Sequence, residues 1–354
     1  MNQTRHSHIW PGVPLALGSA ALFGASAPMS KLLLGDVGPW LLAGILYLGA
    51  GAGLAVFQIV RGAAGFTNNE APLRRGDLPW LLAVILFGGI LGPVLLMFGL
   101  SLTTASTGAL LLNLEGLATM TIAWLVFREN VDRRLLLGAL AILAGAVLLT
   151  WNGATIGLDA GAVLVGAACL AWGIDNNLTR KLSSADPVQI ATIKGLVAGA
   201  VNLGLALETG AAIPGLSVVL AGALTGVFAI GVSLVLFMLA LRHLGTARTG
   251  AYYSLAPFIG ALLAIALLRD PLTPNLLIAA ALMGFGLWMH LTEQHGHMHQ
   301  HEALEHEHAH VHDAHHQHTH DGPVTEPHSH RNRHEPMRHS HVHYPDLHHR
   351  HEHS

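Results

Sequence analysis

The chain has 354 residues, of which 52% are hydrophobic and 11% are charged, and its formal net charge is −3 with histidine neutral. Soluble domains carry roughly 25% charged residues, so this composition places most of the chain in a lipid bilayer. A net charge this small argues against nucleic acid as a partner. The single cysteine, Cys169, excludes a disulfide framework and a Cys-x-x-Cys metal site.

Ten apolar stretches are long enough to cross about 30 Å of hydrocarbon as helices. They lack the alternation typical of a transmembrane barrel, so we predict an all-α, polytopic membrane protein with ten transmembrane helices. The predicted spans are residues 13–34, 38–60, 78–100, 103–127, 133–152, 158–179, 187–208, 216–241, 246–268 and 274–292.

Basic residues are distributed unevenly between the loops that join these spans. One set of loops, together with the amino-terminal segment, holds Arg5, Arg61, Arg74, Arg75, Arg128, Arg133, Arg134, Arg180, Lys181, Arg242 and Arg248. The opposite set holds Lys31 and Arg269. The positive-inside rule therefore predicts that both termini lie in the cytoplasm. We expect the membrane to be the bacterial inner (plasma) membrane.

The junctions before and after the fourth and ninth spans resemble each other. Residues 103–109 read Thr-Thr-Ala-Ser-Thr-Gly-Ala, and residues 245–251 read Gly-Thr-Ala-Arg-Thr-Gly-Ala. The two spans then end in Phe-Arg-Glu at 127–129 and in Leu-Arg-Asp at 268–270. We infer an internal repeat.

The first and sixth spans support the same repeat, because residues 23–31 parallel residues 172–180. The unit is five crossings used twice, and an odd number of crossings makes the second copy run inverted in the membrane. Inverted repeats are an architecture of secondary transporters, with the substrate near the bilayer midplane. We therefore predict two five-helix repeats, at 13–152 and 153–292.

The ten-span pattern, the Leu-Phe-Gly-Ala-Ser sequence at 22–26 and the two Thr-x-x-x-Thr-Gly-Ala junctions resemble the EamA-type transporters of the drug/metabolite transporter superfamily. The resemblance covers residues 13–292. It implies a 5+5 inverted-repeat fold and carrier-mediated movement of small metabolites, often export. One departure concerns the fourth span: where the ninth has Ala256-Pro257, the fourth has Glu115-Gly116.

Three spans carry a charged residue in their interior: Glu115, Asp175 and Lys194. A charge at a helix centre costs roughly 2.5–3.5 kcal/mol on insertion scales, so each of these residues needs a reason to be there. Four asparagines lie in the same spans. The predicted substrate and coupling site comprises Asn113, Glu115, Asp175, Asn176, Asn177, Lys194 and Asn202.

Depth follows from the helical rise of about 1.5 Å per residue. Asp175 and Lys194 both lie about 8–10 Å from the cytoplasmic face, which predicts an ion pair. That pair is either structural or involved in gating or substrate contact. Glu115 lies about 20 Å from the same face, near the midplane, where a carboxyl group without a charged partner suits proton coupling. The alternative is a neutral Glu115 hydrogen-bonded to Asn113, Asn202 or a neighbouring carbonyl.

The termini outside the repeats are a cytoplasmic segment at 1–12 and a tail at 293–354. In the tail, histidines alternate with single residues, and its prolines and low apolar content predict disorder. Imidazole suits zinc, nickel, cobalt and copper, so the tail is predicted to bind such ions, although no cofactor is required. The predicted metal ligands are His295, His297, His299, His301, His306, His308, His310 and His312.

Three functions fit these features. The first is a carrier, most simply a proton-coupled exporter of small metabolites, with a tail that buffers metal or regulates transport. The second is an exporter of a divalent metal cation that the tail collects. The third is a metal sensor or buffer without transport. The spans contain no cluster of His, Cys or Asp, which disfavours zinc or nickel as cargo, whereas a hard cation such as Mg²⁺ is less excluded. No nucleotide-binding loop or nucleophile motif is present, so an enzyme is not expected.

Overall fold

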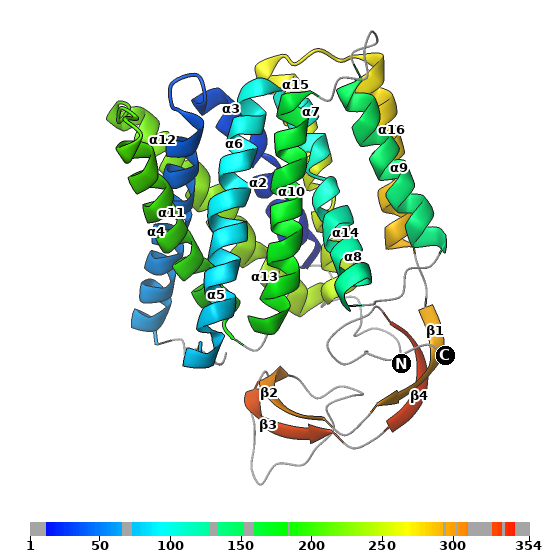
Figure 1. Ribbon diagram of the computed structural model, residues 1–354. Coiled ribbons are helices and arrows are strands. Elements are labelled where there is room, and N and C mark those ends of the chain that lie inside the picture. The colour runs from blue at the N-terminus through cyan, green and yellow to red at the C-terminus, as the bar shows by residue number, and fades with distance from the viewer. Residues whose placement is uncertain are drawn as a thin grey trace.

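The computed structural model of the protein describes residues 12–65, 73–127, 133–151, 159–182, 185–292, 295–301, 304–310, 328–334 and 337–343. The described residues between 12 and 292 form a bundle of helices that run roughly parallel to one axis (Figure 1). The first half of the bundle contains α2 (Gly12–Gly24), α3 (Ser26–Leu33), α4 (Pro39–Ala63), η1 (Arg75–Asp77), α5 (Leu78–Val84), η2 (Ile85–Leu91), α6 (Gly92–Leu102), α7 (Ala105–Leu111), α8 (Leu114–Phe127) and α9 (Arg133–Thr150).

The second half repeats this order. It contains α10 (Ala160–Thr179), η3 (Arg180–Leu182), α11 (Pro187–Glu208), α12 (Leu216–Gly226), η4 (Val227–Val232), α13 (Ser233–Leu244), α14 (Thr246–Tyr253), α15 (Ala256–Leu268) and α16 (Pro274–Leu291). Local sequence fixes several helix starts: Pro stands in the first turn of α4, α11 and α16, where its missing N–H costs nothing. The side chain of Asp186 also accepts a hydrogen bond from the Val188 amide, at 2.8 Å, and so caps α11.

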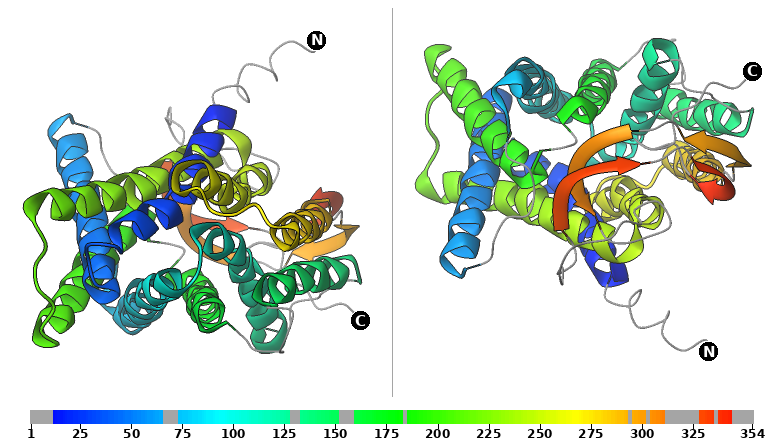
Figure 2. Two further views of the ribbon diagram at one scale, coloured as in Figure 1. Left: turned by 90° about the horizontal axis from the view of Figure 1, so that it is seen from above. Right: turned by 90° about the horizontal axis from the view of Figure 1, so that it is seen from below.

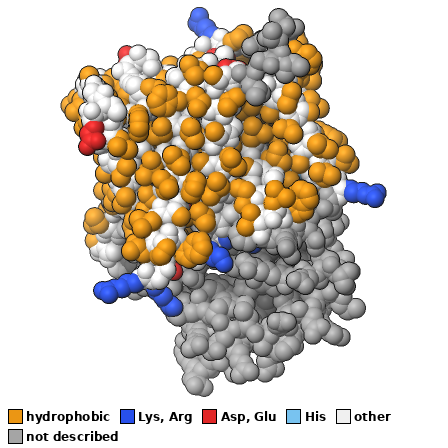
Figure 3. Space-filling model, in the orientation of Figure 1, with side chains coloured by type: hydrophobic (Ala, Val, Ile, Leu, Met, Phe, Trp, Pro, Cys, Tyr) orange, Lys and Arg blue, Asp and Glu red, His pale blue; other side chains and the backbone are white. Residues whose placement is uncertain are grey.

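Nine helical spans in the described part of the chain are long and apolar enough to cross a membrane, as expected of a polytopic all-α protein. The remaining span-length helix, α10, has 20 residues but ends in a polar stretch that contains Asp175, Asn176 and Asn177. Hydrophobic side chains cover the middle of the bundle surface, and Lys and Arg side chains lie toward its ends (Figure 3). We call the end where α4 and α10 finish and α9 begins the arginine-rich end, because Arg61, Arg133 and Arg180 lie there.

Five of the ten spans are interrupted, and the interruptions recur in the two halves. The third and eighth spans each contain a π-helical segment, η2 and η4. The matching junctions begin at residues 103 and 245, which are 142 residues apart. The first residues of η2 and η4, Ile85 and Val227, are separated by the same 142 residues, so the two π-helical segments begin at equivalent positions. The fourth and ninth spans are each split into a short and a longer helix, α7–α8 and α14–α15. The first span is also split, into α2 and α3, whereas its counterpart α10 is continuous.

Several contacts between a helix of one half and a helix of the other have an equivalent contact with the roles of the two halves reversed, as expected of an inverted repeat. The first span packs on α13 and α15 of the second half, while α10 packs on α6 and α8 of the first. The pairs α4–α11 and α9–α16, which each join equivalent helices, lie at opposite ends of the elongated cross-section (Figure 2). The packing therefore relates the two five-helix units in the way that the repeat predicts.

Equivalent helices approach closely through glycine. A β-carbon on Gly195 of α11 would lie 2.8 Å from the Cα of Gly51 on α4, so neither position has room for a larger residue. Gly138 on α9 has the same relationship with α16, since a β-carbon there would lie 2.8 Å from the Gly286 carbonyl oxygen. Small residues let helices associate in lipid, where hydrophobic burial supplies no driving force.

The tail contains four short strands where the sequence analysis expected disorder. They are β1 (His295–His301), β2 (Leu304–His310), β3 (His328–His334) and β4 (Met337–His343). They pair antiparallel, β1 with β4 and β2 with β3. The register sets His297 opposite His341 and His308 opposite His330. His312 lies outside the described residues.

Candidate functional site

The break in the fourth span places Glu115 in the first turn of α8. The helix α7 ends at Leu111, and Asn113 in the break donates a hydrogen bond from its amide to the Leu110 carbonyl oxygen, at 2.8 Å. The Asn113 backbone amide donates to the same Leu110 oxygen, at 3.1 Å, so Asn113 binds the last turn of α7 through both its side chain and its backbone. The alternative in which Asn113 bonds to Glu115 is not seen, and a role of Asn113 in substrate binding or coupling stays a prediction.

Glu115 meets α10 through Asn176. The Asn176 amide donates to the Glu115 Oε1 atom at 3.0 Å and to the Thr119 hydroxyl at 3.1 Å. Thr119 lies one turn further along α8, and its hydroxyl also donates to the Glu115 carbonyl oxygen, at 2.9 Å. The neighbouring Asn177 donates to the Thr119 carbonyl oxygen, at 3.0 Å. A row of asparagines on α10 thus binds the first turns of α8.

The ion pair predicted from the depths of Asp175 and Lys194 is present: the Lys194 ammonium donates to Asp175 Oδ2. The Asp175 side chain is 7% exposed and that of Lys194 is 19% exposed, so the pair is largely shielded from solvent. Gly88 of η2 makes room for it, because a β-carbon there would collide with both side chains. The pair therefore joins α10 and α11 against the π-helical segment of the third span.

The π-helical segment leaves carbonyl oxygens that the backbone does not satisfy. In a π-helix the carbonyl of residue i accepts from the amide of residue i+5, and for Gly88 that residue is Pro93, which has no N–H. The Gly88 oxygen instead accepts from the Tyr47 hydroxyl at 2.9 Å and from the Trp172 indole N–H at 3.1 Å. The η2 segment is thereby fixed to α4 and α10.

Asn202 performs the same task one residue further along. Its amide donates to the Gly89 carbonyl oxygen at 3.2 Å, and the side chain is fully buried. In an α-helical register Gly89 would pair with Pro93, so this carbonyl also lacks its usual donor. Asn202 therefore supports the third span and is not joined to Glu115 by a hydrogen bond.

The structure brings together five of the seven predicted site residues: Glu115, Asn176 and Asn177 at the α8–α10 contact, and Asp175 with Lys194 beside them. The hydrogen-bond partner of Glu115 on α10 is the neutral Asn176, at 3.0 Å, which the estimate of backbone depth did not indicate.

Sequence reasoning missed the residues that bind backbone groups: Tyr47, Trp172 and Thr119. Each is an ordinary residue for an apolar or interfacial helix, and only the π-helical register explains Tyr47 and Trp172. The Gly-Gly-x-x-Gly-Pro sequence at 88–93 was the available signal, because proline in a span interior leaves a carbonyl open. Among the described residues, no group of three or more His, Cys, Asp or Glu is arranged to hold a metal ion. The side chains of the predicted tail ligands lie outside the described part of the structure.

Both five-helix units match the profile of the EamA-like transporter family, one over residues 10–151 and the other over residues 159–292. The chain belongs to the EamA-like transporter family. Together the two matches span both repeats and stop before the histidine-rich tail. This membership makes the protein a multi-pass membrane transporter of the drug/metabolite transporter kind, and it points away from an enzyme.

Relatives and a solved structure agree with the assignment. A protein of Methanothermobacter thermautotrophicus called an uncharacterized transporter is 32% identical over 263 residues, which are 70% of this chain and 77% of that protein. The uncharacterized transporter YyaM of Bacillus subtilis is 24% identical over 197 residues, 53% of this chain and 62% of YyaM. A crystal structure with 20% sequence identity covers 79% of this chain and 95% of its own, with a TM-score of 0.57, and shares the fold.

Proposed function

We propose that the protein exports small metabolites across the bacterial inner membrane in exchange for protons, with both termini in the cytoplasm and Glu115 as the proton-carrying group. The observation that carries this proposal is the position of Glu115 in an interrupted span, bonded to the polar Asn176 of the opposite repeat. A carboxyl group between the two halves of an inverted repeat can bind a proton or a substrate from either side as the halves rearrange.

The Asp175–Lys194 pair supports the proposal that the substrate is a polar molecule. The pair lies on α10 and α11, next to the asparagine that binds Glu115. Charge balance within the pair lets two ionised groups remain in the bundle, where either group alone would be costly. Aromatic Trp172 lies on the same helix, so the region combines charged, amide and aromatic groups, as binding sites for small molecules commonly do.

Proton coupling can be tested without assuming in advance which compound the protein transports. Metabolite profiling of cells with and without the gene identifies a compound that the protein depletes from the cytoplasm. That compound is then loaded into proteoliposomes with an imposed pH gradient. We expect gradient-driven flux in the wild type and loss of the gradient dependence in Glu115→Gln, with Glu115→Asp as the control that keeps a carboxyl group. Gradient-driven flux that persists unchanged in Glu115→Gln would remove Glu115 from the mechanism.

The alternative cargo is a hard divalent cation. The described spans offer carboxylate and amide oxygens, which suit Mg²⁺, and they lack the grouped nitrogen or sulfur ligands that zinc or nickel requires. Proteoliposomes containing a Mg²⁺-sensitive dye separate the two cargoes, because only the cation exporter changes the dye signal when Mg²⁺ is supplied on one side.

For the tail we propose metal binding that regulates transport. The register of β1 and β4 sets three histidine pairs opposite each other: His295 with His343, His297 with His341 and His299 with His339. Residues that alternate along a strand, and residues directly opposite in a pair of strands, share a face of the ribbon. Such a face suits zinc, nickel, cobalt or copper. Deletion of 293–354 is expected to abolish metal binding but to leave metabolite transport without added metal unchanged.

A further inference from the structure

Two of the charged residues at the end opposite the arginine-rich end, Lys31 and Asp270, both act on the junction between α6 and α7. The Lys31 ammonium on α3 donates to the Leu100 carbonyl oxygen at 2.5 Å and to the Thr103 carbonyl oxygen at 2.8 Å. These acceptors belong to the carboxyl end of α6, where a cation is favoured by the helix dipole. Lys31 thus ties the first span to the end of the third.

Asp270 holds the other side of this junction. Its Oδ2 atom accepts a hydrogen bond from the Ser106 amide at 2.8 Å, at the start of α7, where an anion is favoured. Asp270 follows the ninth span, so this bond joins the second repeat to the first. The Asp270 carboxylate also lies near enough to attract the Lys31 ammonium. The junction is therefore held from both sides by opposite charges.

The backbone before Asp270 has an unusual conformation. Arg269 ends α15 with φ of 56° and ψ of 36°, and it is the only residue other than glycine with a positive φ in the described part of the chain. A residue other than glycine adopts the left-handed conformation only at a cost in free energy, and the conformation persists where the surroundings require it. Here it turns the chain out of α15 so that Asp270 reaches α7.

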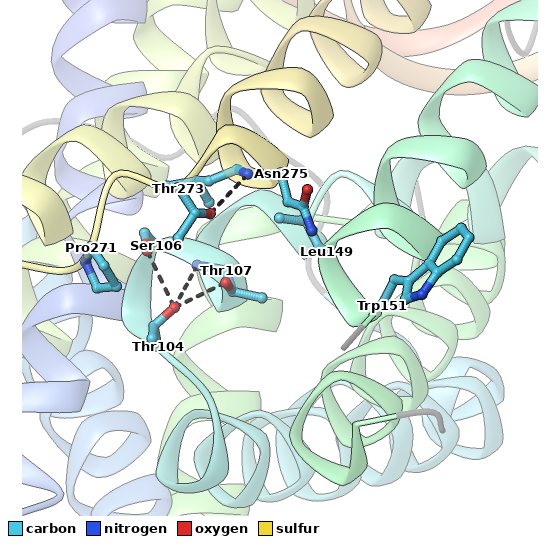
Figure 4. Close-up of a pocket in the computed structure, with 9 residues that line it drawn as sticks. Thr104, Ser106, Thr107, Leu149, Trp151, Pro271, Thr273 and Asn275 are labelled. Atoms are coloured by element: carbon cyan, nitrogen blue, oxygen red, sulfur yellow. Dashed lines mark hydrogen bonds between the residues drawn. The ribbon is translucent and has the colours of Figure 1, made fainter. Parts of the chain in front are cut away.

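A pocket of about 240 Å³ lies beside the junction, lined by hydroxyl groups of Thr104, Ser106, Thr107 and Thr273 and by Trp151 (Figure 4). The Thr104 hydroxyl donates to the Thr107 hydroxyl at 2.9 Å and accepts from the Thr107 amide at 3.3 Å, which caps α7. Beneath this cap, Leu110 on α7 is buried. The polar pocket and the buried Leu110 thus lie at the same short helix, α7.

We propose that Lys31 and Asp270, which we call the Lys31–Asp270 latch, close the bundle at this end and that their release opens it. The inference rests on the proposed transport function, because a carrier must open alternately at its two ends. Charged hydrogen bonds at helix ends suit this task, since they form in one state and exchange for water in the other. The latch sets how much of the population is closed at this end.

The internal repeat supplies a counterpart at the other end. The match of residues 23–31 with 172–180 pairs Lys31 with Arg180, and the match of 268–270 with 127–129 pairs Asp270 with Glu129. Glu129 lies outside the described residues, so this correspondence comes from the sequence. In the sequence, a basic residue at the first span of each repeat and an acidic residue after the fourth span of each repeat therefore occur in both copies.

The latch can be tested by cysteine labelling, because Cys169 is the only cysteine in the sequence and is buried. In a Cys169→Ala background, Leu110→Cys reports access from the latch end and Thr179→Cys reports access from the arginine-rich end. A membrane-impermeant maleimide is applied to intact spheroplasts and, separately, to inverted vesicles. The labelling rate needs neither a known substrate nor a pH gradient.

Lys31→Met and Asp270→Asn are each expected to raise the labelling rate of the Leu110→Cys reporter about tenfold and to lower that of the Thr179→Cys reporter, as loss of one charged hydrogen bond shifts a two-state equilibrium. Asp36→Asn is the matched control, because Asp36 is exposed near the same end, and it should change neither rate. Lys31→Arg, which keeps the donors, should behave like wild type. Arg180→Met should shift both reporters in the opposite direction.

Unchanged labelling of the Leu110→Cys reporter in both latch variants would overturn the proposal. A parallel rise of both reporters would also overturn it, because that pattern indicates loosening of the fold instead of exchange between two states. Opposite changes together with metabolite flux that does not depend on Glu115 would leave the latch standing and reject proton coupling. The two proposals therefore fail in different experiments.

Discussion

Pro93 removes the backbone donor of the Gly88 carbonyl oxygen, and side chains from two other spans replace it. Tyr47 donates at 2.9 Å and Trp172 donates at 3.1 Å. If a buried carbonyl keeps one of its two donors, the protein loses little stability. If it keeps neither, the free energy of unfolding falls by the full desolvation penalty of that carbonyl. The two side chains should therefore act as partial substitutes for each other.

Tyr47→Phe or Trp172→Phe alone is expected to lower the free energy of unfolding by about 0.5–1.5 kcal/mol, and the double variant by about 1–3 kcal/mol more than the sum. Denaturant unfolding in detergent micelles measures these values. Adding Pro93→Ala to the double variant should recover part of the loss, because alanine supplies an N–H near the Gly88 oxygen. Simple additivity of the two single variants would contradict the assignment of a shared acceptor.

Gly88→Ala should disrupt the Asp175–Lys194 pair without changing any charge. A β-carbon at Gly88 would collide with the Asp175 carboxylate and the Lys194 ammonium, so the pair must shift. We expect a loss of stability of about 1–3 kcal/mol and reduced transport of whichever compound profiling identifies. Gly204→Ala on α11 is the control, since a β-carbon there meets open space. Equal behaviour of the two variants would show that the packing at Gly88 is unimportant.

Arg269 offers a test of backbone conformation that is separate from charge. Arg269→Gly should stabilise the protein by up to about 1 kcal/mol, because glycine adopts a positive φ without strain, and should keep the latch closed. Arg269→Val should destabilise it and raise labelling of the Leu110→Cys reporter, because a β-branched residue resists this conformation. Thermal unfolding and labelling rates check both results. Labelling that rises equally in both variants would instead assign the effect to loss of the arginine charge.

Metal binding by the tail should depend steeply on pH. Imidazole binds metal in its neutral form, and its unperturbed pKa is about 6.5, so affinity should fall as the pH drops through this value and be fully present above it. Calorimetric titration of the full-length protein with Zn²⁺ at pH 7.5 and pH 5.5 tests this, with the 293–354 deletion as the control. Binding that survives deletion, or that is equal at both pH values, would place the metal elsewhere.

Most of the architecture could be predicted from the sequence because the membrane restricts the choices. Long apolar stretches must be helices, and the matching junctions at 103–109 and 245–251 reveal the repeat. The interruptions were harder to predict. Hydropathy does not distinguish an α-helical register from a π-helical one, so η2 and η4 became evident only in the structure.

The charged residues of the site could be predicted from the sequence, whereas the residues that form hydrogen bonds with them were harder to predict. Asp175 and Lys194 could be paired because both are costly alone and lie at similar distances from loops. The partner of Glu115 could not be found in the same way, since Asn176 is uncharged and lies on a helix of the other repeat. Asn113 and Asn202 look equally polar in the sequence, but their side-chain amides donate to backbone carbonyls, of Leu110 and of Gly89, and not to Glu115.

The coincidence of η2 and η4 has a consequence for the ancestry of the chain. The two π-helical segments begin at matching positions of the two copies. A π-helical register that was already present in the five-helix unit before its duplication and fusion would account for both. Glu115 and Pro257, which occupy matching positions, then record how the two descendants diverged after that event.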